Sequence, residues 1–416
     1  MWESLSAALS SLTFWQFASI PLISGLVGWA TNVMALKMTF YPINFVGFKP
    51  IGWQGIIPSK AGVMAGKAVD LLTKNLITIE DRFSQLDAER VADEMEPVLH
   101  RLSQEILEET MEEEAPVIWE ALSASVREEL QERISYEIPA VVSGLMEEVK
   151  THITELFDLR EMVVEALEKD RELLNQIFLE VGDQEFRFIE RSGFYFGCLF
   201  GVVQMVIFYF CWQAGFSAGW ILPTAGLFVG WATNYLALRM IFEPLYQRKV
   251  LFWRVQGLFI RRQKEVAAAY AQILAREILT AQNIFQRLVE GPTAHRLEKI
   301  VQRHIKKAVD QQIGVGKSLI QVTSGAQTYV NIKKRIAKGF SDELPFAIRH
   351  VFEYAGEALN IEHTLRTRMQ QLGPREFVSF LRPIFQEDEW KLILVGAMLG
   401  FGAGLAQWAF IFGMNG

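Results

Sequence analysis

Hydrophobic positions follow two kinds of pattern along this chain. Three stretches carry no Asp, Glu, Lys or Arg: those between Glu3 and Lys37, between Arg191 and Arg239, and after Lys391. An uncharged apolar run of about 18 residues or more is typical of a membrane-spanning helix, because ~20 residues at ~1.5 Å rise cross the hydrocarbon core. The middle stretch is 47 residues long, enough for two crossings and a turn. We therefore predict four spans, at residues 14–37, 193–211, 219–241 and 392–413.

Outside the spans, apolar residues recur every three to four positions, which is the period of an amphipathic helix rather than of a strand. The first polar region shows this stripe best, at Leu122, Val126, Leu130, Ile134, Ile138, Val142, Leu145, Val149, Ile153 and Leu156. Little of the sequence reads as strand. Prolines are expected to punctuate the helices, at Pro116, Pro139, Pro345, Pro374 and Pro383. The pattern predicts an all-α integral membrane protein with four transmembrane helices and two long helical regions outside the bilayer.

A long motif is written twice. GWATNVMALKMTFYP at residues 28–42 returns as GWATNYLALRMIFEP at residues 230–244, with ten of the fifteen positions identical. The closing spans also match, GCLFGVVQMVIFYF (197–210) with GFGAGLAQWAFIFG (400–413). Each copy reads span, interfacial segment, polar helical region and span, so the sequence predicts a tandem internal duplication. The predicted interfacial segments are residues 38–59 and 242–260, and the predicted polar regions are residues 60–190 and 261–390.

The charges beside the spans predict the orientation. Four spans place both polar regions on one face of the membrane and both termini on the other. Basic residues crowd the polar face next to the spans: Lys37, Lys49, Lys60, Lys67, Arg239, Arg248, Lys249, Arg254, Arg261, Arg262 and Lys264. By the positive-inside rule the polar regions are expected in the cytoplasm and the termini outside. The first span is expected to stay as an anchor, because its leader carries Glu3 and no Lys or Arg.

The two polar regions carry opposite charge. Residues 60–190 hold 13 basic and 32 acidic residues, a net charge of −19, whereas residues 245–391 hold 24 basic and 14 acidic residues, a net charge of +10. Regions of opposite charge tethered to the same face attract each other, so we predict one composite helical bundle. A basic region can indicate nucleic-acid binding. Because an acidic partner is already part of the chain, no nucleic-acid partner is predicted.

The repeated motif places polar residues inside the first and third spans. Thr31 and Asn32 share a helix face with Gly28, and Thr233 and Asn234 share one with Gly230. Small residues let helix backbones approach, and an Asn amide in lipid needs a partner; we expect Asn32 near Asn234 across a twofold axis. The second and fourth spans carry matching residues, Gly193, Gly197, Gly201 and Gln204, and Gly396, Gly400, Gly404 and Gln407. The Thr, Asn and Gln side chains are either helix-packing contacts or a solute pathway, and packing is favoured because no acidic residue lies within the spans.

The ends of the spans carry candidate interfacial residues. Lys37 and Arg239 lie about one turn before Pro42 and Pro244, from where their long side chains reach the membrane surface. The aromatic segments that follow suit the headgroup region. Further candidates at this level are Gly55, Lys60, Gly257, Asp388, Glu389 and Trp390.

Candidate chemistry is sparse. Cys198 and Cys211 are 13 residues apart on one predicted helix, too far to form a disulfide, and the six histidines have no metal-binding spacing. GVGKS at residues 314–318 lacks the first glycine of a phosphate-binding loop. No nucleophile–base pair is found. We therefore predict no catalytic residue, no metal and no cofactor.

The set of motifs resembles the bacterial membrane proteins grouped as domain of unknown function 445 (DUF 445). The residues that carry the resemblance are Gly28, Thr31, Asn32, Ala35, Met38, Phe40, Pro42, Gln54, Gly55, Pro58, Lys60, Phe385, Asp388, Glu389, Trp390, Gly400 and Gln407. The resemblance covers nearly the whole chain. The second copy departs from it, with Ile260 at the position of Pro58 and Arg262 at that of Lys60. The family implies a bacterial inner-membrane protein without an established activity.

Taken together, these features favour a non-enzymatic membrane protein whose cytoplasmic helical bundle binds lipid headgroups or protein partners. A small-solute transporter or channel built from the duplicated two-helix unit, completed by homo-oligomerisation, is the alternative. An enzyme that uses Asp388 and Glu389 as paired carboxylates ranks third, because nothing in the sequence positions them.

Overall fold

The computed structural model describes residues 12–48, 51–214, 218–250, 253–312, 325–382 and 389–412. Its α-helices are α2 (Leu12–Phe40), α3 (Ile56–Ser59), α4 (Ala61–Asn75), α5 (Ile79–Phe83), α6 (Ala88–Glu114), α7 (Pro116–Ala121), α8 (Ala124–Thr151), α9 (Ile153–Leu156), α10 (Leu159–Lys169), α11 (Arg171–Gln213), α12 (Ala218–Phe242), α13 (Leu258–Arg261), α14 (Gln263–Ile273), α15 (Ala281–Glu290), α16 (Ala294–Gln312), α18 (Ala326–Ala347), α19 (Phe352–Leu359), α20 (Ile361–Gln371), α21 (Pro374–Leu381) and α23 (Glu389–Gln407). Four short strands accompany them, β1 (Val46–Phe48), β2 (Ile51–Trp53), β3 (Arg248–Val250) and β4 (Trp253–Val255).

The chain forms two compact units, each built from segments far apart in sequence. The membrane unit comprises the described residues of Met1–Leu71, Val164–Tyr270 and Arg366–Gly416. The polar unit comprises those of Leu72–Val163 and Ala271–Leu365. Each unit therefore combines the first and second halves of the chain.

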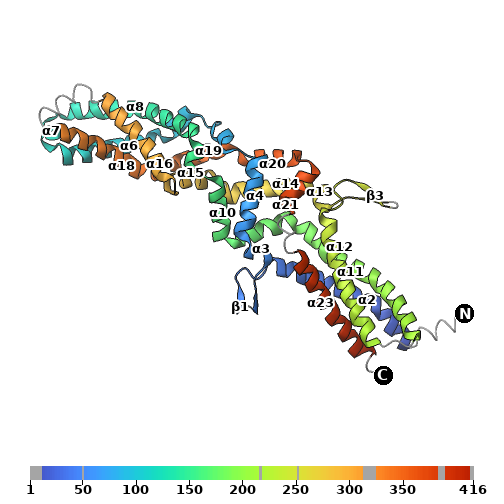
Figure 1. Ribbon diagram of the computed structural model, residues 1–416. Helices are drawn as coiled ribbons and strands as arrows, with labels where there is room; N and C mark the ends of the chain where they lie inside the picture. The colour runs from blue at the N-terminus through green and yellow to red at the C-terminus, as the bar shows by residue number, and fades with distance from the viewer. Residues whose placement is uncertain are drawn as a thin grey trace. The chain divides into compact units, whose positions relative to one another are not determined.

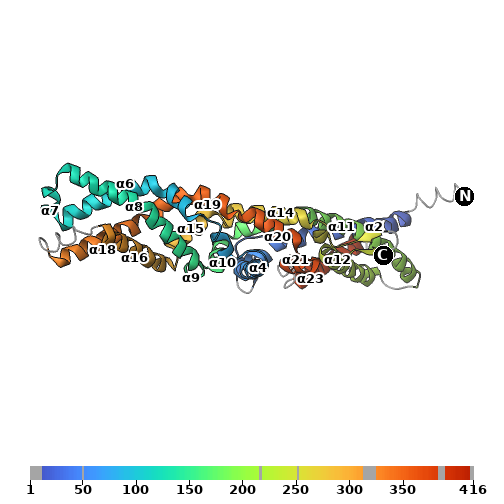
Figure 2. The same ribbon diagram turned by 90° about the horizontal axis from the view of Figure 1, so that it is seen from above.

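The membrane unit contains four helices long and apolar enough to cross a membrane, at Trp15–Phe40, Arg171–Cys211, Trp220–Phe242 and Glu389–Phe410. They belong to α2, α11, α12 and α23, which form a ring in which each helix contacts the next (Figures 1 and 2). Large apolar side chains such as Trp15, Phe210 and Trp220 are exposed on its outside, as expected for a lipid-facing surface. The predicted all-α membrane architecture is confirmed at this level.

Helix α11 runs without a break from a charged segment into an apolar one. It has 43 residues, and the boundary predicted at residue 193 falls inside it. The charged residues end at Arg191, so the change from polar to apolar surroundings occurs along a continuous helix. The composition predicted where the apolar part of α11 begins, and the backbone stays helical across that point.

The two predicted interfacial segments contain β-hairpins that the sequence pattern did not indicate. β1 pairs antiparallel with β2, with Val46 opposite Trp53, and β3 pairs antiparallel with β4, with Arg248 opposite Val255. The expectation that little of the chain is strand agrees with these four strands of three residues each. Three-residue strands are too short to show an alternating period.

The polar unit is a second ring of four helices. α6 contacts α8, α8 contacts α16, α16 contacts α18, and α18 contacts α6; the four lie side by side in both views (Figures 1 and 2). Asp87 begins α6 by accepting hydrogen bonds from the backbone N–H groups of Glu89 and Arg90, which are otherwise unsatisfied at a helix start. The predicted apolar stripe of α8 is buried at Ile138, Val142 and Val149, whereas Val126 near the start of the helix is exposed.

Two prolines do not end helices as predicted. Pro139 lies inside α8 and Pro345 lies inside α18, whereas Pro116 and Pro374 stand at helix starts, where the missing N–H is harmless. Pro383 lies outside the described residues. An interior proline removes one helical hydrogen bond. In α8 the apolar residues on both sides of Pro139 are buried, and their packing offsets this loss.

Ion pairs join acidic helices of the first half to basic helices of the second half within the polar unit. Arg335 of α18 forms ion pairs with Glu109, Glu113 and Glu114 of α6. Arg303 of α16 pairs with Glu148 of α8. The composite bundle predicted from the opposite charges of the two regions is confirmed for this unit.

Candidate functional site

The first helix pair of the membrane unit, α2 and α11, is in contact at several glycines and one asparagine. α2 and α11 run antiparallel, and a Cβ atom at Gly28 would collide with the carbonyl oxygen of Gly193. Gly197 meets Ser24 in the same way one turn further on. The backbones therefore touch. Asn32 is fully buried and donates a hydrogen bond of 2.6 Å to the carbonyl oxygen of Ile189 on α11.

The second helix pair repeats this geometry. A Cβ at Gly230 would collide with the carbonyl oxygen of Gly396, and one at Gly226 with that of Gly400. Asn234 donates a hydrogen bond of 2.8 Å to the carbonyl oxygen of Leu392 on α23. The expected pairing of Asn32 with Asn234 is wrong, because each amide bonds within its own helix pair. Because the glycines let the two helices of a pair approach closely, a backbone carbonyl oxygen of the partner helix lies within hydrogen-bond distance of each Asn amide.

The other polar residues predicted for the spans bond within their own helix or differ between the two helix pairs. Thr31 donates to the carbonyl oxygen of Gly28, and Thr233 donates to that of Val229, each within its own helix. Gln204 accepts a hydrogen bond from Ser24 across the first pair. Gln407 is buried, and its amide nitrogen has no hydrogen-bond partner among the described residues. The predicted glycines Gly201 and Gly404 also lie against the partner helix, at Pro21 and Pro223.

Both hairpins are attached to the ends of spans by the same contacts. Pro42 and Pro244 follow cis peptide bonds. The N–H groups of Gly55 and Gly257 donate to the carbonyl oxygens of these prolines, at 2.9 and 3.0 Å. A Cβ at either glycine would strike the last backbone atoms of α2 or α12, so both positions require glycine. The hairpins are thereby fixed against the helix ends.

Of the remaining interfacial candidates, Arg239 and Glu389 line the same pocket at the end of α12. Arg239 donates to Glu243 and to the hydroxyl of Tyr235, both at 2.7 Å. Lys60 ends the short helix α3. Glu389 begins α23, and Trp390 is exposed. Lys37 lies in the last turn of α2, whereas Asp388 lies outside the described residues.

A buried ion pair links the two halves of the membrane unit near these segments. Glu185 of α11 is only 1% exposed and accepts two hydrogen bonds from Arg262, at 2.8 and 2.9 Å. Arg262 stands where the first copy has Lys60, and its planar fork suits such a two-fold contact. This departure of the second copy therefore has a structural use.

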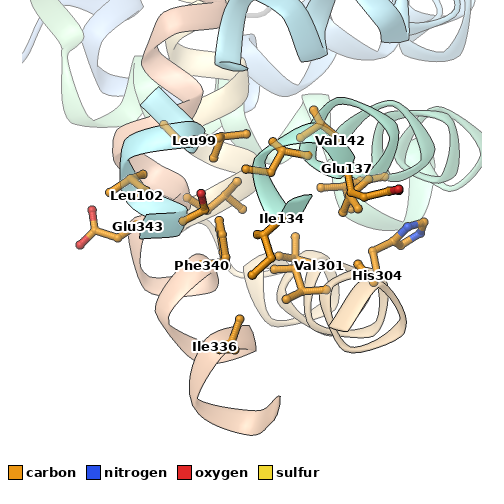
Figure 3. A pocket seen from close by; sticks show the side chains of 18 of the residues that line it. Leu99, Leu102, Ile134, Glu137, Val142, Val301, His304, Ile336, Phe340 and Glu343 are labelled. Atoms are coloured by element: carbon orange, nitrogen blue, oxygen red, sulfur yellow. The ribbon is translucent and has the colours of Figure 1, made fainter. Parts of the chain in front are cut away.

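An apolar space lies in the polar unit, between the four ring helices. It has a volume of about 570 Å³. Side chains from α6, α8, α16 and α18 line it, mainly Leu99, Leu102, Leu107, Ile134, Ile138, Val142, Leu145, Val301, Ile305, Ile332, Ile336, Phe340 and Leu344. Figure 3 shows Ile134, Phe340 and Val301 directed toward the space between the helices. The apolar stripe predicted between residues 122 and 156 includes Ile134, Ile138 and Val142, and the structure places these side chains at the edge of the space.

Charged side chains stand at the edges of the cavity. Glu343 and His304 lie on opposite sides of it (Figure 3). His304 is 2.7 Å from Glu148 through its Nε2 atom, and Arg303 is paired with the same carboxylate. The hydrogen bond from His304, together with the charge of Arg303, holds the pKa of Glu148 below its ordinary value of 4.5. The interior is therefore apolar, and at its border His304 is engaged with Glu148.

Metal binding has no support among the residues that the structure describes. They include no group of three or more His, Cys, Asp or Glu side chains that could hold a metal ion. Cys198 and Cys211 are free thiols.

The chain is similar over part of its length to bacterial proteins named UPF0754 membrane proteins. Those of Staphylococcus aureus strains MRSA252, JH9 and Newman are each 28% identical to it over 102 residues, which is 24% of this chain and 26% of theirs. The match thus spans about a quarter of these relatives. No family model matches the chain, and no solved structure matches it. With the four apolar helices, this similarity supports an integral membrane protein, while the resemblance to DUF 445 stays a prediction.

Proposed function

We propose that this chain is a non-enzymatic membrane protein that binds the acyl chain of a lipid in the cavity of its polar unit. The observation that carries the proposal is the apolar space of about 570 Å³ lined mainly by α6, α8, α16 and α18. Ligand sites in proteins have volumes of roughly 300 to 1,000 Å³ and mostly apolar linings. This cavity meets both criteria.

The free-energy cost of an unfilled apolar space supports the proposal that a ligand occupies it. A void in a protein core destabilises the fold by ~24 cal/mol per Å³. The space of about 570 Å³ in the polar unit is partly open rather than sealed, so part of this cost applies to it. Water is a poor filling for a space lined by Leu, Ile, Val and Phe. An apolar ligand removes this cost.

An acyl chain is the ligand class that the position and shape of the site favour. The lining comes from four long helices, whose side chains border the space along their length. Each buried methylene of a chain contributes ~0.8 kcal/mol. The protein is anchored in a membrane, where acyl chains are abundant. Because the space lies between helices rather than on one face, it suits a flexible chain better than a protein partner.

The orientation and origin of the fold belong to the same proposal. We place the polar unit in the cytoplasm and the termini outside, in a bacterial inner membrane, because basic residues crowd the span ends on that side. We also propose a duplicated two-helix unit, supported by equivalent contacts 202 residues apart at Gly28 and Gly230, Asn32 and Asn234, and Gly55 and Gly257. Labelling of a single cysteine at Val117, an exposed residue of α7, from either side of the membrane tests the orientation.

The test of lipid binding uses a palmitate analogue with a photoactivatable diazirine, supplied to the full chain in native membranes. Illumination is expected to attach the probe to cavity-lining peptides of α6, α8, α16 or α18, as read by mass spectrometry. Ala308→Phe adds a ring to the lining of α16 and is expected to remove this labelling. Val117→Phe, on an exposed position, is the matched control. Labelling that avoids these helices, or that Ala308→Phe leaves unchanged, contradicts the proposal.

Small-solute transport gains no comparable support. The Thr, Asn and Gln side chains that prompted it mostly bond within single helices or within one helix pair. In its favour stand only buried amide atoms, Oδ1 of Asn32 and Nε2 of Gln407, which have no hydrogen-bond partner among the described residues of the spans.

A further inference from the structure

The membrane unit has a second feature of ligand-binding character at the end of the first span. A groove of about 690 Å³ runs between the last turns of α2 and the first hairpin. It is lined by Met34, Lys37, Met38, Tyr41, Pro42, Ile43, Asn44, Val46 and Trp53. We infer that this groove binds the phosphate of an anionic membrane phospholipid through Lys37. The inference is independent of the cavity in the polar unit.

The groove combines one cation with an apolar wall. Lys37 is exposed and lies one turn from the end of α2. Neither an ion pair nor a side-chain hydrogen bond of Lys37 occurs within the part of the chain that the structure describes. Met34 lies one turn before Lys37 on the same helix face, and Met38 lies one turn after Met34. An ammonium beside methionine side chains offers the two contacts that the phosphate and the upper acyl chain of a phospholipid require.

Trp53 of the hairpin adds a hydrogen-bond donor. Its indole N–H is shielded in the groove wall and has no partner among the described residues. An indole nitrogen can only donate, and an unsatisfied buried donor costs ~1–3 kcal/mol. Because this nitrogen is buried, a phosphate or ester oxygen in the groove accepts its hydrogen bond only once the ring has turned toward the groove. Tyr41, 50% exposed on the opposite wall, gives the groove the aromatic border typical of the headgroup level.

The position of the groove selects a bilayer lipid as the occupant. Phe40 ends a helix long and apolar enough to cross a membrane, so Lys37 reaches the level of the headgroups. On the hairpin, Phe48 is 88% exposed and Val46 is 63% exposed. Exposed apolar side chains of this size beside a span are expected to face lipid. A phospholipid in the groove therefore contacts both the helix and the hairpin.

The corresponding place in the second half is chemically different and serves as an internal control. Arg239 stands where the first half has Lys37, but it is held by Glu243 and Tyr235, both at 2.7 Å. Glu243 also pairs with Arg382 at 3.3 Å. Tyr41 occupies the position equivalent to Glu243, so the first half lacks that carboxylate. The cation is available at Lys37 and engaged at Arg239.

The test measures which lipids stay bound to the full chain. The protein is reconstituted in nanodiscs of phosphatidylcholine with one fifth phosphatidylglycerol, extracted in mild detergent, and the retained lipids are counted by native mass spectrometry. Lys37→Gln is expected to lower phosphatidylglycerol retention by about fivefold, since one basic residue at an anionic surface contributes ~1 kcal/mol. Lys37→Arg and Arg239→Gln are expected to retain it.

Three outcomes overturn the inference. Equal retention by Lys37→Gln and the unchanged protein excludes Lys37 as the binding cation. An equal loss in Arg239→Gln indicates a general effect of surface charge rather than a site. Displacement of the lipid by millimolar inorganic phosphate alone assigns the site to free phosphate. Circular dichroism of each variant confirms that the helices are intact.

Discussion

In the ring of α2, α11, α12 and α23, helices of a pair meet at glycines, whereas in the ring of α6, α8, α16 and α18 they are held apart by Leu, Ile, Val and Phe. The backbone of Gly28 touches that of Gly193, and Gly230 touches Gly396. In the polar unit the large side chains surround a space of about 570 Å³. Four helices in a ring thus close or stay hollow according to the size of the facing residues.

The difference follows from what drives each assembly. In lipid there is no hydrophobic gain from bringing helices together, so close packing and hydrogen bonds between helices decide the geometry. In water the burial of large apolar side chains is itself favourable, at ~25 cal/mol per Å². A helix ring held together in this way can leave a space at its centre that a ligand fills. The closed ring serves as an anchor, and the hollow ring is the proposed binding site.

The strongest way to break the comparison is to force the closed ring open. Gly28→Leu and Gly230→Leu each place a side chain where the partner backbone lies, so each is expected to destabilise the membrane unit by about 3 kcal/mol or more. Unfolding in mixed micelles with increasing dodecyl sulfate measures this. Gly402→Leu is the control, because a Cβ there meets no atom within 4 Å. Equal losses at all three positions would contradict the glycine contact.

Filling the hollow ring is expected to have the opposite sign. Ala308→Phe adds apolar volume to the cavity lining and should stabilise lipid-free protein by about 1.5 kcal/mol. Thermal loss of helicity, followed by circular dichroism after removal of bound lipid, shows the shift. A lower midpoint would mean that the centre of the ring is already filled by side chains.

Substitutions of the two interhelical Asn side chains sharpen the comparison. They measure how much hydrogen bonds, in addition to packing, stabilise the closed ring. Asn32→Leu and Asn234→Leu each remove one bond to the partner helix and are expected to cost about 0.6–1 kcal/mol. The same dodecyl sulfate titration applies. Thr224→Val, which removes a hydrogen bond within α12 only, is the matched control and should cost less. Unequal effects of the two Asn variants would break the equivalence of the helix pairs.

The smallest expected effect concerns pH in the hollow ring. Because the pKa of Glu148 is lowered in the folded protein, its contribution is present above its ordinary value of 4.5 and is lost as the pH falls through the folded-state pKa. Glu148→Gln should therefore cost about 0.5 kcal/mol at pH 7, since its partner Arg303 is 63% exposed. The difference should vanish below the folded-state pKa in thermal melts. A difference that persists in acid would exclude the charge as its cause.

Much of the architecture could be predicted from the chain alone. Charge-free runs located the four spans, because a charged side chain in the bilayer core is costly. The three- to four-residue period marked the long helices, and the opposite charges of residues 60–190 and 245–391 predicted that they combine, which the Arg335 and Glu113 contact illustrates. The glycines and amides were placed on the correct helix faces, because a helix fixes which residues share a side.

What the sequence determined by itself is local: which segments are helical, which face of each is apolar or small, and where charge is excluded. The tertiary structure alone decided which partner Asn32 takes, that hairpins follow Pro42 and Pro244, and that the polar ring encloses a cavity. The physical reason is that these depend on distances between elements far apart in the chain. A stripe such as Ile134, Ile138 and Val142 specifies burial, but the volume left between four such stripes depends on the spacing of the helices.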